Sequence, residues 1–103
     1  MSKNRRLELH FMLCDILGSK NVYFQPPESA KLEYPCIIYN LSDIDIKYAD
    51  NRPYAIRDKY AVTVVDKDPD SNIRRKILKL PQCKFSRFFT SDNLNHWMFD
   101  IYY

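Results

Sequence analysis

The chain has 103 residues, of which 46% are hydrophobic, and this favours one compact domain spanning residues 1–103. Its single glycine excludes the glycine-rich loops with which nucleotide-binding proteins bring backbone amides close to phosphates. The formal net charge of +3 is mixed in sign and is smaller than the footprint expected of a dedicated nucleic-acid binder. No apolar run approaches the roughly 20 residues of a membrane-spanning helix, so no membrane contact is expected.

Residues 3–17 predict an amphipathic helix. Its apolar stripe is expected to comprise Leu7, Phe11, Cys14 and Leu17, widened by Leu13 and Ile16. Gly18 follows at the position of a left-handed C-cap. The segment is basic and then apolar, as in a signal peptide, but Glu8, His10 and Asp15 interrupt it and no small-residue cleavage site follows. We therefore expect a helix in a mature intracellular protein.

Several strands are predicted after this helix. "NVYFQPP" indicates a short strand that the prolines end, and "PCIIYNL" indicates a strand covered on both faces. Residues 43–52 alternate less regularly and predict an extended loop or a hairpin arm. From Tyr54 to Asp66 the alternation is clear, and this segment is expected to be the longest strand.

Three aspartates at alternate positions follow: Asp66, Asp68 and Asp70. They match the start of a calcium-binding EF-hand loop, but that loop needs glycine at its sixth position and glutamate at its twelfth, where this chain has Ser71 and Ile77. We therefore interpret the segment as a strand-to-helix turn in which Asp70 or Ser71 caps the next helix.

That helix is predicted over residues 72–80, with Ile73, Ile77 and Leu80 buried. Residues 84–90 and 96–103 predict a C-terminal β-hairpin around a turn at 91–95. The order of elements favours an α+β fold: a single, mainly antiparallel β-sheet with the N-terminal helix and the second helix packed on one face.

No catalytic set is apparent in the sequence. His10 and Cys14 are four residues apart on the first helix, but a structural zinc needs four ligands, usually in closely spaced pairs. The three cysteines are widely spaced and are expected to be reduced, buried thiols. We expect no metal, no cofactor and no enzymatic activity.

Aromatic residues are unusually frequent, with eight tyrosines and six phenylalanines. Tyrosine is enriched at protein interfaces, where its ring buries area and its hydroxyl stays hydrated. We expect four tyrosines to share one face that includes rings reaching the surface: Tyr48, Tyr54, Tyr60 and Tyr102. The basic side of the helix at 72–80 leaves an alternative open, which is a small nucleic-acid-binding protein that uses this helix.

The short N-terminal helix, the phrase "YPCIIYNL", the long strand "YAIRDKYAVTVVDKDPDS" that leads into a helix, and the closing hairpin "FTSDNLNHWMFDIYY" form a pattern over nearly the whole chain. This pattern resembles the tail-terminator or tail-completion proteins of long-tailed bacteriophages and prophages, which are also described as minor tail or head-to-tail joining proteins.

The resemblance implies a non-enzymatic virion protein that is assembled in the bacterial host cytoplasm. Such proteins form a ring, commonly a hexamer, at the head-proximal end of the tail tube, where the ring ends tube growth and offers a docking surface to the head connector. DNA passes through its lumen. The implied partners are therefore other copies of the chain, the tail tube protein and the connector.

The resemblance supplies no motif that fixes functional residues, so the candidates come from the residues themselves. The oligomer-interface candidates lie in and beside the predicted arm: Asp43, Ile44, Asp45, Ile46, Lys47, Tyr48, Asp50, Arg52 and Tyr54. The candidates for facing the lumen or the tube are the basic residues of the second helix: Arg74, Arg75, Lys76 and Lys79.

Overall fold

The computed structural model describes residues 5–103, with the exception of the Tyr54 side chain. The elements follow the order α1 (Arg5–Leu17), β1 (Val22–Phe24), β2 (Cys36–Ala49), β3 (Arg52–Asp66), α2 (Ile73–Leu78), β4 (Cys83–Ser91) and β5 (Leu94–Tyr102). The predicted first helix also included residues 3 and 4, which lie outside the described residues. The longest strand is β3, as predicted.

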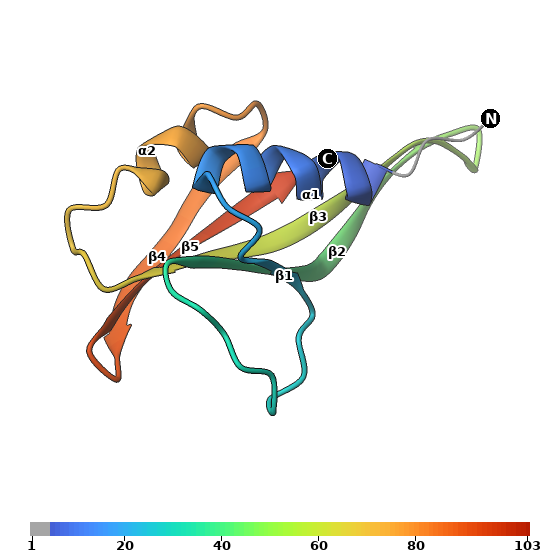
Figure 1. Cartoon of the computed structure of the whole chain (residues 1–103). Helices are drawn as coiled ribbons and strands as arrows, with labels where there is room; N and C mark the ends of the chain where they lie inside the picture. Colours follow the sequence, from blue (N-terminus) through green and yellow to red (C-terminus); the bar gives the residue numbers. More distant parts are fainter. Residues whose placement is uncertain (1–4) are drawn as a thin grey trace.

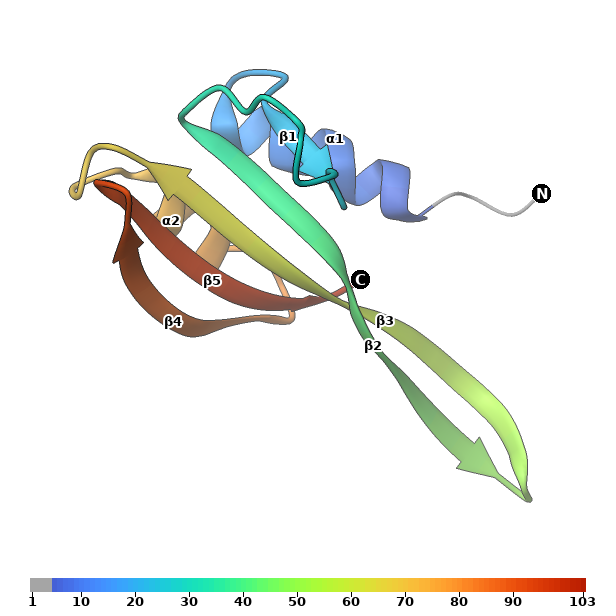
Figure 2. The same cartoon turned by 90° about the horizontal axis from the view of Figure 1, so that it is seen from below.

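Residues 5–103 contain one five-stranded sheet with the order β1-β2-β3-β5-β4. The short β1 pairs parallel with β2, and the other neighbouring strands pair antiparallel. Both helices lie over the same face of this sheet (Figures 1 and 2). The predicted α+β fold, with its mainly antiparallel sheet and C-terminal hairpin, is therefore confirmed.

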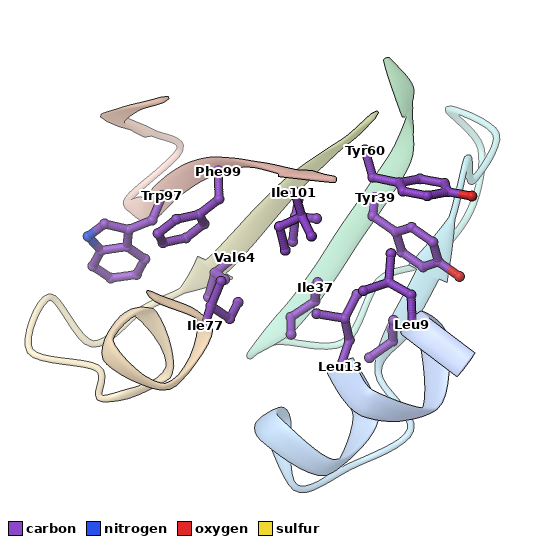
Figure 3. Packing of buried hydrophobic residues seen from close by; sticks show 12 residues of the cluster. Leu9, Leu13, Ile37, Tyr39, Tyr60, Val64, Ile77, Trp97, Phe99 and Ile101 are labelled. Atoms are coloured by element: carbon purple, nitrogen blue, oxygen red, sulfur yellow. The ribbon is translucent and has the colours of Figure 1, made fainter. Parts of the chain in front are cut away.

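The core lies between the helices and the sheet (Figure 3). Leu9 and Leu13 of α1 and Ile77 of α2 are fully buried against apolar side chains of the strands. Those strand residues are Val22, Ile37, Tyr39, Tyr60, Val62, Val64, Trp97, Phe99 and Ile101. Because the core draws on both helices and all strands except β4, its burial fixes the position of each of those elements.

The predicted stripe of α1 is wrong at two positions. Phe11 is 63% exposed and Leu7 is also exposed, whereas Leu9 and Leu13 are buried. Each helical residue turns the direction of its side chain by about 100°, so Phe11 lies roughly on the opposite side of the helix from Leu9 and Leu13. The predicted C-cap is present, because Gly18 has φ +79° and its N–H donates a hydrogen bond of 2.8 Å to the carbonyl of Cys14.

The predicted cover of "PCIIYNL" on both faces holds only at its start. Cys36, Ile37 and Tyr39 are buried, but Asn40 and Leu41 are exposed. The strand also continues to Ala49, since the segment predicted as a loop or a hairpin arm is a hairpin arm formed by β2 and β3.

The three aspartates before α2 form a turn, as predicted. The carboxylates of Asp66 and Asp68 each accept a hydrogen bond from the backbone N–H two residues later, at 3.0 and 2.9 Å. The N-cap is Asn72, however, and its side chain makes no capping bond. Ser71 contributes instead, because its hydroxyl accepts a hydrogen bond of 3.3 Å from the N–H of Ile73. The helix is shorter than predicted and ends at Leu78.

Candidate interaction surface

The hairpin of β2 and β3 extends beyond the rest of the sheet. From the pair Ile44–Asp58 outward, β2 and β3 pair only with each other, because β5 reaches β3 no further than Lys59 and β1 reaches β2 no further than Tyr39. We call residues 44–58 the arm. Its projection gives the molecule extents of 51 × 27 × 25 Å (Figure 2).

One face of the arm is mainly apolar and exposed, and it also carries Asp58, which pairs with Ile44. Ile46 pairs with Ile56, which is 61% exposed, and Ile44 lies two residues before Ile46 on the same face. Leu41 continues this row toward the body, where it pairs with the core residue Tyr60. We call the exposed residues of this row the stripe, namely Leu41, Ile44, Ile46, Tyr48 and Ile56. The stripe therefore extends the core face of the sheet into a region that neither α1 nor α2 covers (Figure 2).

The other face of the arm is polar. Asp45 pairs with Arg57 in a salt bridge of 2.9 Å. Arg57 also donates a hydrogen bond to Gln82 at 2.8 Å, and its guanidinium lies 4.7 Å from the centre of the Tyr102 ring. The arm is thus amphipathic: one face carries the Asp45–Arg57 ion pair and Lys47, and the other carries the stripe.

The remaining interface candidates lie at or near the ends of the arm. The carboxylate of Asp43, at the base, accepts a hydrogen bond of 2.8 Å from the backbone N–H of Ile44. Lys47, Asp50 and Arg52 are exposed. Tyr54 is an arm residue of β3 at the register shift between Pro53 and Ala55, and its side chain is outside the described part of the chain.

The predicted face of four tyrosines does not exist as one surface. Tyr48 is 62% exposed on the arm, but Tyr60 is only 4% exposed and belongs to the core. Tyr102 pairs with Lys59, next to Tyr60, and therefore lies on the opposite face of the sheet from Tyr60. The assignment was wrong because Tyr60 lies on the part of β3 that the helices cover.

The basic residues in and beside α2 differ in burial and in the contacts that they make. Arg74 is half-buried: it donates a hydrogen bond of 2.9 Å to the carbonyl of Pro69, and its guanidinium lies 5.5 Å from the Trp97 ring centre. Arg75, Lys76 and Lys79 are exposed. The structure does not bring α2 and the arm together, since they lie at opposite ends of the molecule (Figures 1 and 2).

A second apolar surface lies beside α2, and sequence reasoning missed it. A groove of about 300 Å³ runs between α2 and the hairpin of β4 and β5, and we call it the α2–β4 groove. Its lining consists of Arg74, Leu78, Phe85, Phe88, Trp97 and Phe99. Leu78, Phe85 and Phe88 are exposed because α2 ends at Leu78 and β4 is the edge strand of the sheet. The apolar residues of "CKFSRFF" predict a strand, but they do not show which of its side chains stay uncovered.

The titratable groups near the core do not assemble into a reactive centre in the described residues. Nδ1 of His10 lies 2.8 Å from the Tyr39 hydroxyl, and burial, with a smaller effect from Arg6, lowers the pKa of His10. Burial is also the main cause that raises the pKa of Cys36 and of Cys83, each to about 11. These two thiols are therefore protonated at neutral pH, which disfavours nucleophilic chemistry.

Residues 5–103 contain no cluster of three or more side chains of the kinds that ligate metals. Within the same part of the chain, no helix has both the length and the apolar composition needed to cross a membrane.

A scan against protein-family models found no match to this chain, and a search of curated proteins also found none.

Proposed function

We propose that the protein is a non-enzymatic structural component that assembles with copies of itself, as a tail terminator or a head-to-tail joining protein of a long-tailed phage or prophage. In this proposal it forms a ring, commonly a hexamer, at the head-proximal end of the tail tube within the virion. The ring contacts the tube protein and the head connector, and DNA passes through the lumen.

The observation that carries the proposal is the stripe on the projecting arm. A two-stranded hairpin is at best marginally stable alone in water, and this one also exposes several large apolar side chains on one face. A continuous exposed apolar surface of this kind marks an interaction site. If another copy of the chain covered the stripe, it would bury the apolar surface of the arm and thereby stabilise the arm.

Two further features support the assignment. The α+β fold agrees with the one that the family resemblance implies. On the face of the arm opposite the stripe, the charges of Asp45 and Arg57 are paired within the chain, whereas the large apolar side chains of the stripe are exposed.

Sedimentation velocity of the purified chain over a range of concentrations, with and without tail tubes, tests this proposal. Tyr48→Asp places a charge on the stripe, so we expect it to abolish assembly and tube-end binding while thermal unfolding stays ordinary. Phe11→Asp is the matched control, because Phe11 is exposed to the same degree but lies on α1, away from the arm. A wild-type chain that stays monomeric and does not bind tubes would overturn the proposal.

A further inference from the structure

We propose that the α2–β4 groove receives the arm of a second copy of this chain, so that each copy donates its arm to one neighbour and receives the arm of another. This inference deepens the proposed function, on which it rests, by naming the surface that covers the stripe.

The groove and the stripe have matching chemistry. Leu78, Phe85 and Phe88 are exposed along the groove. Phe85 and Phe88 each use one side of the ring to pack on the core, since their ring centres lie 5.6 Å from Phe99 and 5.4 Å from Trp97 respectively. Their other sides are open. The stripe offers aliphatic side chains that project from a narrow two-stranded ribbon, a shape that can enter a groove between a helix and an edge strand.

The charges of the two surfaces are complementary. Arg74 lines the groove, none of the six lining residues is acidic, and the exposed cations of α2 lie beside it. On the arm, Asp58 is directly opposite Ile44 and so lies on the stripe face, and the exposed Asp50 lies at the tip. Among the basic residues of the arm, Lys47 and Arg57 lie on the opposite face, and the exposed Arg52 lies near Asp50 at the tip. Approach of the stripe to the groove would therefore place acidic groups near basic ones.

The positions of the two surfaces require a second copy. The arm projects from one end of the long axis, whereas α2 and β4 lie toward the other end (Figures 1 and 2). An arm therefore cannot fill the groove of its own chain. A contact between two different surfaces of identical chains is heterologous, and such contacts produce a ring when the rotation between neighbours closes.

The lengths are compatible. The six β2 residues of the arm, Ile44–Ala49, span about 20 Å, and the nine residues of β4 span about 30 Å at the usual rise per residue. The arm can thus lie along β4 over its full length, and the part of β4 between Phe85 and Phe88, which lines the groove, receives a portion of the stripe.

Sedimentation velocity of four samples tests the inference: the wild-type chain, the arm variant Tyr48→Asp, the groove variant Leu78→Glu, and an equimolar mixture of the two variants. Leu78 is exposed on α2, so its replacement by glutamate is compatible with the fold. We expect the wild type to assemble and each variant alone to be monomeric, with association weakened at least about tenfold, which corresponds to 1.4 kcal/mol.

The mixture gives the decisive result. The groove variant retains a wild-type arm and the arm variant retains a wild-type groove, so one contact remains possible per pair. We therefore expect the mixture to form heterodimers and no larger species. Circular dichroism of each variant shows whether it is folded, and Phe88→Ser provides a second groove variant if Leu78→Glu does not fold.

The other outcomes separate the two proposals. If the folded groove variant assembles like the wild type while Tyr48→Asp does not, the arm has a different receptor: this inference fails and the proposed function stands. If both variants are monomeric alone and the mixture is also monomeric, the arm-in-groove contact fails in the same way. A wild type that stays monomeric and does not bind tail tubes overturns the proposed function itself.

Discussion

Phe11 and Leu13 lie two residues apart on α1, and their surroundings differ: Leu13 is fully buried in the core, whereas Phe11 is largely exposed. Removing the Leu13 side chain would leave a cavity between α1 and the sheet. We expect Leu13→Ala to lower the free energy of unfolding by about 2–5 kcal/mol. Phe11→Ala should change it by no more than about 0.5 kcal/mol, as for most exposed positions.

Urea denaturation followed by far-ultraviolet circular dichroism measures both changes. If Phe11→Ala were the more destabilising variant, the buried side of α1 would include Phe11, as the sequence pattern predicted. That result would contradict the placement of α1 in the structure.

The difference between the predicted and the observed buried side of α1 has a physical reason. The helix carries apolar residues on more than one side, so its periodicity permits either the side of Leu7 and Phe11 or the side of Leu9 and Leu13 to face the sheet. The sheet determines which side is buried, because Leu9 and Leu13 pack in the same core cluster as Ile37 and Val64. That cluster is assembled from strands distant in sequence, and a helix pattern alone does not contain this information.

At the scale of elements, the two antiparallel hairpins carry a local signal in their turn residues. Both antiparallel hairpins turn on an Asp-Asn pair, Asp50-Asn51 in the arm and Asp92-Asn93 between β4 and β5. All four residues have positive φ, between 53° and 63°. Two-residue turns of type I′ require this conformation at both positions, and aspartate and asparagine tolerate it better than most residues. The repeated pair therefore indicated two tight hairpins, including a full-length arm.

The candidate site was only half predictable from the sequence. The arm was found because its alternation and turn residues are local signals. The α2–β4 groove depends on α2 ending at Leu78 and on β4 being at the edge of the sheet, and strand order is a property of the whole chain. Exposure of Phe85 and Phe88 follows from that order, so it was not readable from their own segment.

The basic side of α2 provides a prediction about the alternative function. Arg74 is engaged by Pro69 and Trp97, which leaves Arg75, Lys76 and Lys79 exposed. We expect the triple change of these three residues to glutamine to affect binding to duplex DNA no more than the matched change of Lys20, Lys31 and Lys67, which are also exposed. Fluorescence anisotropy at several salt concentrations provides the measurement. A selective loss in the α2 variant, with the salt slope reduced by about two to three, would favour the nucleic-acid-binding function.

At the scale of the whole molecule, the body and the arm have separable roles. The buried core lies entirely in the body, and the arm residues 44–58 contribute none of the core side chains described in the structure. Asp43 and Lys59 are paired at the base of the arm, so replacing residues 44–58 with Asn-Gly would join them through a two-residue turn. We expect this armless chain to fold, with a free energy of unfolding within about 1 kcal/mol of the wild type.

The armless chain should be monomeric at every concentration at which the wild type assembles, because it lacks all of the stripe except Leu41. A control keeps the arm at full length and makes its stripe polar, through the combined changes Ile44→Thr, Ile46→Thr and Ile56→Thr, since threonine is also favourable in strands. If the stripe drives assembly, the armless chain and the threonine variant should both sediment as monomers. Loss in the armless chain alone would mean that the arm acts through its reach or its backbone, and assembly of both would mean that copies meet through the body.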